Sequence, residues 1–270
     1  MTPTQVWKLF LILIVISGMN SNIFADTTDD PCGGPSALLN IVDRPTIGDS
    51  ACVVPVKKAV LEFGYQYQKL SHAAGHQQNF PETEFRLGIP AHNELVILLP
   101  NYIHQSMIQR SGFSAATIGI KHEIGYTKNL VATVESLFTL PNGSAAFGNK
   151  GLGAALNGIA SYTVNSVLNL TFMLGGSTET TSSADGGQRF TSINPDIVLT
   201  YSLNPKVDLY GETYGQSKTG PGAGSGFNFD GGIIYLLYPA LTVDLEFGQR
   251  ISGDLGGFDH YIGTGMAIEF

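Results

Sequence analysis

Residues 240–249 read ALTVDLEFGQ, a stretch in which apolar and polar side chains alternate. Successive side chains of a β-strand point to opposite faces, so a strand here has one apolar face and one acidic face. The apolar face carries Leu241, Val243, Leu245 and Phe247, and the other carries Thr242, Asp244, Glu246 and Gly248. A second sheet would cover the apolar face in a soluble sandwich. In an outer-membrane barrel that face meets lipid, and the polar face lines a lumen.

The last residues, 260–270, repeat this alternation and end on Phe270. Ile262, Met266 and Ile268 share the face of this aromatic residue. A C-terminal strand of this kind resembles the assembly signal of bacterial outer-membrane barrels. We therefore predict that the barrel-assembly machinery recognises Phe270.

The same alternation recurs throughout residues 57–270, in segments near the ~10 residues that a strand needs to cross an outer membrane at a tilt. The predicted strands are 58–69, 82–89, 93–103, 115–123, 129–138, 154–163, 166–175, 190–201, 207–216, 227–237, 240–249 and 260–270. Their connections alternate between short turns and long polar loops, the latter at 71–80, 106–113, 141–151, 176–187, 217–225 and 251–259. This asymmetry is typical of barrels with periplasmic turns and external loops. The predicted fold is all-β: a transmembrane antiparallel up-and-down β-barrel of about 12 strands, closed by the C-terminal strand.

Composition agrees with a barrel in the outer membrane of a Gram-negative bacterium. Charged residues make up only 13% of the chain, and 33 residues are glycine, which suits a lipid-facing surface with tight turns. No helix-length apolar run follows residue 25, so a membrane-spanning structure would have to be a closed barrel. The net charge of −8 argues against a nucleic-acid partner, which requires a basic surface.

The N-terminus predicts an export signal over residues 1–25. Lys8 precedes the apolar run LFLILIVIS, and Ala25 offers a cleavage site before Asp26. The alternative is an uncleaved anchor, for which the apolar run is short. Asp30 and Pro31 precede Cys32 where a lipoprotein would need small apolar residues, so lipidation is not expected.

Residues 26–56 are rich in proline and predict a lead with little regular structure, either a periplasmic tail or a lumenal plug. Cys32 and Cys52 both fall in this lead. Because the periplasm is oxidising, a disulfide between them is expected. A metal site would need further soft ligands nearby, and none follows.

Charged side chains on the polar faces of the strands are the candidate lumen-lining residues. They are Glu62, Glu84, Arg86, Lys121, Asp208, Glu212, Asp230, Asp244 and Glu246. Such carboxylates can favour the passage of neutral and cationic solutes. The alternative is a polar packing network that fills a narrow barrel.

No catalytic residue, metal site or cofactor is predicted. His104 and Ser106 share strand parity, as do His122 and Ser114, but neither pair has a supporting acid at an evident position. We therefore do not expect the protein to be an enzyme.

Several short motifs fall in an order that resembles the outer-membrane transporter family named for the meta pathway of phenol degradation, distant relatives of the fatty-acid channels. They are EFRLG at 84–88, ELVILLPNY at 94–102, GIK at 119–121, PNG at 141–143 with AFG at 146–148, YGE at 210–212, DGGIIY at 230–235 and LTVDLEFG at 241–248. The resemblance covers roughly residues 57–270. Asn142 departs from it, since relatives often carry Thr there. The resemblance implies a monomeric outer-membrane barrel that admits small, often apolar or aromatic, molecules.

The sequence thus predicts a channel or transporter in the outer membrane, with passage through an acidic lumen and residues 26–56 as its gate. The second hypothesis is a barrel that does not transport and serves as a surface-interaction or structural protein. The third is a secreted soluble β-sandwich.

Overall fold

The computed structural model describes residues 30–107 and 109–270. The predicted signal peptide lies outside the described residues and stays a prediction. Within the described part of the chain, no helix is long and apolar enough to cross a membrane.

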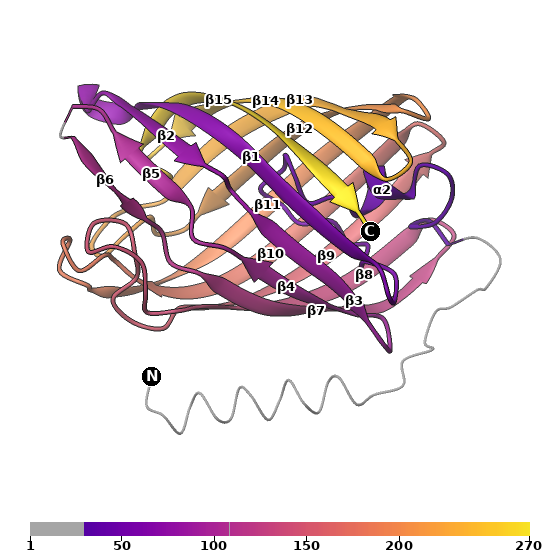
Figure 1. Cartoon of the computed structure of the whole chain (residues 1–270), viewed down its shortest axis with the longest axis horizontal. Coiled ribbons are helices and arrows are strands. Elements are labelled where there is room, and N and C mark those ends of the chain that lie inside the picture. Colours follow the sequence, from indigo (N-terminus) through magenta and orange to yellow (C-terminus); the bar gives the residue numbers. More distant parts are fainter. Residues whose placement is uncertain (1–29, 108) are drawn as a thin grey trace.

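In these described residues, fifteen strands form one antiparallel sheet, which closes on itself where β15 pairs with β1 (Figure 1). The closing register runs from Val60 opposite Glu269 to Leu70 opposite Phe258. The strands are β1 (Ala59–Leu70), β2 (His76–Phe80), β3 (Glu84–Ile89), β4 (Asn93–Leu98), β5 (Tyr102–Gln105), β6 (Arg110–Phe113), β7 (Thr117–Thr127), β8 (Leu130–Thr139), β9 (Ala154–Asn165), β10 (Leu168–Thr180), β11 (Arg189–Asn204), β12 (Val207–Gln216), β13 (Gly226–Tyr238), β14 (Leu241–Ser252) and β15 (Phe258–Glu269).

The chain passes from one end of the barrel to the other twelve times. There are fifteen strands because three of these crossings are each split into two strands. β1 pairs with β3 near its start and with β2 near its end, so β2 and β3 are halves of one crossing. β4 with β5, and β6 with β7, form the other two. Pro81 and Pro100 lie at two of the breaks, and proline cannot donate a backbone hydrogen bond to the sheet. The predicted 12-stranded barrel is confirmed.

Two of the predicted long loops are wrong because each contains a separate strand, and those at 176–187 and 251–259 are shorter than predicted because the flanking strands extend into them. Residues 71–80 contain β2, and residues 106–113 contain β6. β2 reads HQQNF and lacks the apolar alternation that marks a lipid-facing strand. Its interior amides instead form a hydrogen-bonded cluster with β1 and β5, in which Gln77 Nε2 donates to Gln68 and Gln105 Nε2 donates to Gln77.

The outer surface of the wall is apolar and the interior is polar. Leu209 of β12, Ile233 of β13 and Leu245 of β14 lie side by side in the register and are all exposed on the outside. Most fully buried large side chains of the wall are charged, Arg86, Lys121 and Glu212 among them. This distribution is the reverse of that in a soluble protein and is typical of a barrel whose outer surface contacts lipid.

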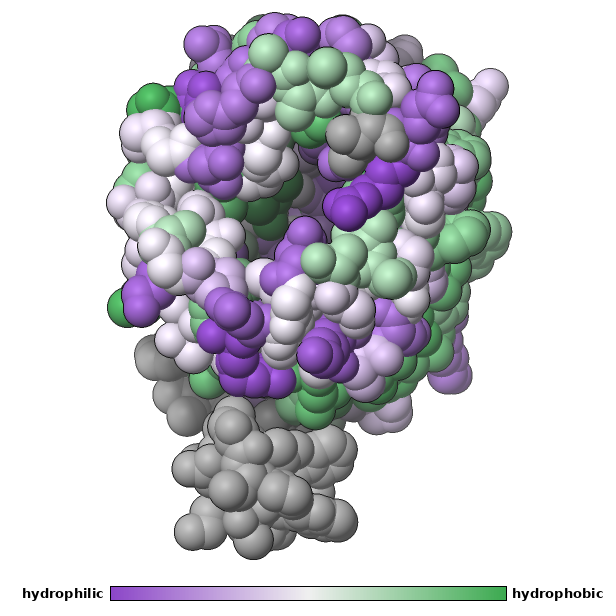
Figure 2. All heavy atoms as spheres, turned by 90° about the vertical axis from the view of Figure 1, so that its left-hand side faces the viewer, coloured by the Kyte–Doolittle hydropathy of each residue, from purple (hydrophilic) through white to green (hydrophobic). Residues whose placement is uncertain are grey.

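The two ends of the barrel differ. Short connections at 90–92, 128–129, 166–167, 205–206 and 239–240 gather at one end, which we call the turn end and which corresponds to the predicted periplasmic side. The C-terminus lies at the turn end, on the right in Figure 1. The longer connections form the loop end, on the left, and Figure 2 shows a hollow in the centre of that face.

Residues 30–56, the plug segment, lie inside the barrel (Figure 1). This segment contains one short helix, α2 (Ala37–Ile41), where the sequence predicts little regular structure. Leu38 and Ile41 of the helix are buried in an apolar cluster that includes Val131 of β8 and Ile234 of β13. The predicted disulfide between Cys32 and Cys52 is present and closes the segment into a loop.

Candidate functional site

The plug segment meets one side of the lumen in a buried charge network. Arg86 of β3 donates from Nε to Glu94 Oε1 of β4 at 2.7 Å and from Nη2 to Glu94 Oε2 at 3.0 Å. Its Nη1 lies 3.1 Å from Asp43 Oδ2 of the plug segment and 3.2 Å from Glu62 Oε1 of β1. Lys121 Nζ of β7 lies 3.3 Å from Asp43 Oδ2 and 3.7 Å from Glu94 Oε1. Asp43 therefore joins the two buried cations of the wall.

Cross-strand pairing explains how this network forms. Glu94 and Lys121 are register partners on β4 and β7, and Glu62 is the partner of Glu84 on β3. Residues at every second position share a face of a strand, so Arg86 lies on the same face as Glu84. Pairing between strands of the barrel thus brings most of the network together, and the plug segment contributes the carboxylate of Asp43.

Arg44, the next residue of the plug segment, makes a second set of ion pairs further around the wall. Its guanidinium lies 3.0 Å from Glu82 Oε2, 3.4 Å from Asp244 Oδ1 and 3.4 Å from Glu246 Oε1. Burial alone would lower the pKa of Arg44, but these carboxylates outweigh it and hold the pKa above its usual value. Arg44 is therefore a permanent cation in the lumen.

The opposite side of the lumen is an acidic wall on β11, β12 and β13, made of Asp196, Glu212 and Asp230. Glu212 accepts hydrogen bonds from the backbone N–H of Ile47, at 3.0 Å, and of Gly48, at 2.7 Å. Among the described residues, no ion pair neutralises these three carboxyls. No group of three or more His, Cys, Asp or Glu side chains in that same part of the chain is arranged to hold a metal ion. Glu212 therefore binds the plug segment through backbone N–H groups and not through a cationic side chain.

Three further contacts fix the plug segment to the wall. The backbone N–H of Val54 donates to Glu94 Oε2 at 2.6 Å, and the hydroxyl of Thr133 donates to the carbonyl of Ala51. The hydroxyl of Ser36 donates to the carbonyl of Pro205, in the turn between β11 and β12, at 2.6 Å.

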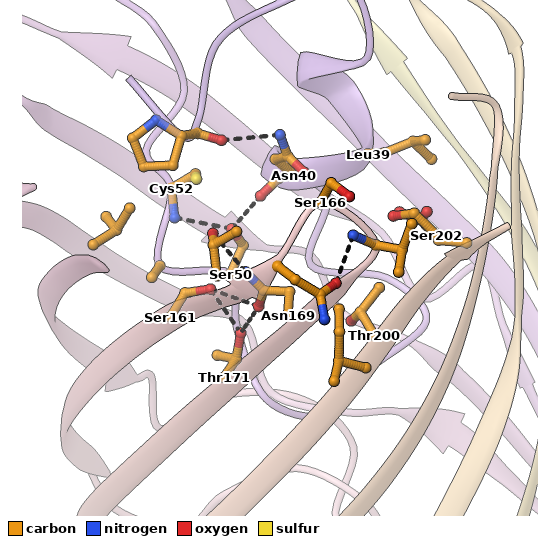
Figure 3. Close-up of a pocket in the computed structure, with 18 of the residues that line it drawn as sticks. Leu39, Asn40, Ser50, Cys52, Ser161, Ser166, Asn169, Thr171, Thr200 and Ser202 are labelled. Atoms are coloured by element: carbon orange, nitrogen blue, oxygen red, sulfur yellow. Dashed lines mark hydrogen bonds between the residues drawn. The ribbon is translucent and has the colours of Figure 1, made fainter. Parts of the chain in front are cut away.

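A cavity of about 300 Å³ lies between the plug segment and β8 to β12 at the turn end (Figure 3). Hydroxyl, amide and carboxylate side chains dominate its lining: Asn40, Ser50, Ser161, Thr163, Asn165, Ser166, Asn169, Thr171, Thr200, Ser202 and Asp208. Figure 3 shows Ser161, Asn169 and Thr171 joined by hydrogen bonds across β9 and β10.

The predicted lumen-lining residues fall into three groups. Six contact the plug segment directly: Glu62, Arg86, Lys121, Glu212, Asp244 and Glu246. Asp230 instead accepts from the hydroxyl of Tyr261 at 2.7 Å, and Asp208 borders the cavity. Glu84 lies beside the network on the face of β3 that carries Arg86, and it is half-buried.

Sequence reasoning missed the charged residues that the plug segment brings into the lumen and one charged residue of the wall that binds this segment. Asp43, Arg44 and Asp49 lie in the plug segment, and Glu94 lies on β4. Glu94 is the first residue of the ELVILLPNY motif, but the apolar run behind it obscures the alternation. A charged pair directly before Pro45, in a lead otherwise rich in small residues, is the signal that marks Asp43 and Arg44.

A closed barrel with an apolar outside, a charged lumen and an inserted N-terminal segment defines the class: an outer-membrane β-barrel protein. This fold agrees with the outer-membrane location predicted from the sequence. Residues 43–255 match the family model described as "Putative MetA-pathway of phenol degradation", and the chain belongs to that family. The resemblance seen in the sequence is thus confirmed, and the match begins inside the plug segment.

Solved structures with the same fold include three channels. The COG4313 outer membrane channel from Pseudomonas putida F1 has a TM-score of 0.65 and 12% identity, over 83% of this chain and 100% of that one. The NanC porin has a TM-score of 0.53 and 12% identity, over 78% and 98%. The KdgM porin in complex with oligogalacturonate has a TM-score of 0.54 and 8% identity, over 78% and 99%. No curated protein matches the chain at a significant level.

Proposed function

We propose that this protein is an outer-membrane channel for small molecules in which the plug segment is the gate of the lumen. One observation carries the proposal. The middle of the plug segment is held by ion pairs and backbone hydrogen bonds to the wall, at Asp43, Arg44 and Gly48. Water can replace such contacts when the segment moves, and the strands of the wall pair with one another without it.

The lumen favours neutral and cationic solutes over anions, because its unpaired charges are carboxylates on the acidic wall. The family description mentions phenol degradation, so phenolic molecules are the first solutes to compare. The carboxylate surplus supports the passage of uncharged phenols over their anions.

The test is single-channel conductance of the full chain in planar bilayers. The wild type is compared with Asp43→Asn and Arg44→Gln, each of which weakens all the ion pairs that one residue of the plug segment makes. We expect rare or small openings in the wild type, and longer or larger cation-preferring openings in both variants. Lys58→Gln is the control, since Lys58 precedes β1, is half-exposed and pairs at 2.8 Å with Glu269 of β15, a residue of the wall and not of the plug segment.

The second candidate, a barrel that does not transport, is supported by the same buried network, which fills one side of the lumen. It would prevail if both variants stayed silent while folding normally, and if liposomes containing them took up phenol no faster than empty ones. Heat-modifiable gel mobility monitors folding in each case.

A further inference from the structure

We infer that the cavity at the turn end is a binding site for compact, uncharged molecules that carry several hydroxyl groups. The inference rests on the proposed function, because this would be the last binding site on the path of a solute that leaves the lumen through the turn end. It goes beyond that function by assigning a binding place, and by adding polyhydroxylated molecules to the phenols as a second class of solute.

The wall of the cavity is a lattice of hydrogen-bonding side chains on adjacent strands. β9 supplies Ser161 and Thr163, and β10 supplies Asn169 and Thr171, in each case two residues apart on one face. On β11, Thr200 is the register partner of Asn169 and Ser202 is the partner of Asp208 on β12. The plug segment completes the lining with Asn40 and Ser50.

One side of this lattice is already fixed by internal hydrogen bonds. Ser161 Oγ donates to Asn169 Oδ1 at 2.8 Å, and Thr171 Oγ1 donates to the same atom at 3.2 Å. On the plug segment, Ser50 Oγ donates to the carbonyl of Asn40 at 2.6 Å. These side chains are therefore held in place before a ligand arrives, which reduces the entropy lost on binding.

The other side carries the carboxylate of Asp208, which is only 5% exposed and lies opposite Ser202 in the register. Asp208 and Ser202 both border the cavity. An ionised carboxylate only accepts hydrogen bonds, so at this side the cavity favours a ligand that brings hydroxyl donors.

The size and charge of the cavity define the ligand class. About 300 Å³ lies at the lower end of ligand pockets, which span roughly 300–1,000 Å³, so the ligand is compact. The lining carries one carboxylate, Asp208, and one ammonium, Lys128, so its formal charges cancel and it does not offset the desolvation cost of a charged ligand. Leu39, Val131 and Leu168 offer apolar patches against which the C–H faces of a ring can pack.

The test is calorimetric titration of the full chain, purified in detergent, with myo-inositol and glucose as probes and with phenol and glucuronate as comparators. We expect millimolar binding of the two polyols and weaker binding of both comparators. Asp208→Leu should weaken polyol binding roughly tenfold or more, and Thr200→Val about fivefold, since each removes a hydrogen-bonding group. Ser192→Ala is the matched control: Ser192 is buried on β11 and lies outside the cavity.

Three results would overturn the inference: no polyol binding, equal binding to wild type and both cavity variants, or glucuronate binding as tightly as glucose. Phenol binding that exceeds polyol binding would assign the cavity to apolar rings instead. Conductance is measured separately, so a protein that conducts but binds no polyol would refute this inference and leave the channel function intact. Thr200→Val keeps the volume and shape of the side chain, so it tests the site even where Asp208→Leu fails to fold.

Discussion

The carboxylate of Asp43 lies 3.1 Å from the guanidinium of Arg86, so a residue of the plug segment joins a charge network whose other members belong to the wall. Arg86 is completely buried, and so are Glu62 and Glu94 beside it. Removing a charge from such a network leaves its partners buried and uncompensated. Without Asp43, the charges of the wall still pair with one another. Without Arg86, the buried carboxylates of Glu62 and Glu94 lose their shared cation.

Arg86→Leu should destabilise the barrel itself. The substitution leaves Glu62, Glu94 and Asp43 without their shared cation, at a cost of about 3–5 kcal/mol. The measurement is the temperature at which the folded band disappears in heat-modifiable electrophoresis. Arg189→Leu is the control, because Arg189 is exposed at the loop end and donates to Thr178 and to the Leu152 carbonyl, not to a buried charge. Equal melting of the two variants would show that the buried network does not stabilise the wall.

The strands of the wall can be predicted from the sequence because side chains that face lipid must be apolar, which requires an apolar residue at every second position. Along β14, Leu245 and Phe247 face outward, whereas Asp244 and Glu246 face inward, as their alternation indicates. The two strands that were missed, β2 and β6, lie near the loop end. β2 is stabilised by amide contacts between side chains and not by an apolar stripe.

The site was less predictable because it depends on contacts between distant parts of the chain. Alternation correctly selects Arg86 and Lys121 as polar-face residues of a barrel. It cannot show that Asp43 lies between them, since nothing in a proline-rich lead fixes where it folds. The position of Arg44 likewise depends on which carboxylates of the wall lack a cation. The register of neighbouring strands determines this, and alternation within one strand does not show it.

Gly48→Val should displace the plug segment from the acidic wall. A Cβ atom at Gly48 would lie 3.0 Å from the carboxyl atoms of Asp196, so the branched side chain of valine would push the loop away. Overpacking of this kind costs roughly 1–3 kcal/mol. We expect more frequent openings in single-channel recordings. Gly33→Ala is the control within the same segment, because its Cβ would meet nothing closer than 3.5 Å. Identical conductance of the two variants would mean that the Gly48 contact does not close the lumen.

Raising the pH should loosen the plug segment through Asp49. Burial raises the pKa of Asp49 well above its usual value, and the neighbouring carboxylate of Glu135 raises it further. Six charged or titratable groups face Asp49 from the plug segment and the wall: Asp43, Glu84, Arg86, Lys121, Glu135 and Asp196. The docked state therefore keeps a proton that the released segment would lose. Docking is favoured at low pH and weakens as the pH rises through the raised pKa.

The measurement for Asp49 is the open probability of single channels from acidic to alkaline pH, which should increase with pH in the wild type. Asp49→Asn keeps the shape and the hydrogen-bonding capacity of the side chain but cannot ionise, so it should flatten this dependence. Asp185→Asn, in an exposed loop between β10 and β11, should leave it unchanged. An unaltered pH profile in Asp49→Asn would assign the effect to another carboxyl.

Reduction of the Cys32–Cys52 disulfide should open the lumen without unfolding the barrel. The two cysteines are 20 residues apart, and closing a loop of about this length stabilises a fold by about 3 kcal/mol. Both cysteines belong to the plug segment, so the loss falls on its helix α2 and on its contacts with Val131 and Ile234. A reductant should therefore increase conductance while the folded band in heat-modifiable electrophoresis persists. The double variant Cys32→Ser with Cys52→Ser should show the higher conductance from the start and ignore the reductant. If reduction instead abolished the folded band, the plug segment would be part of the folding core of the barrel and not a gate within it.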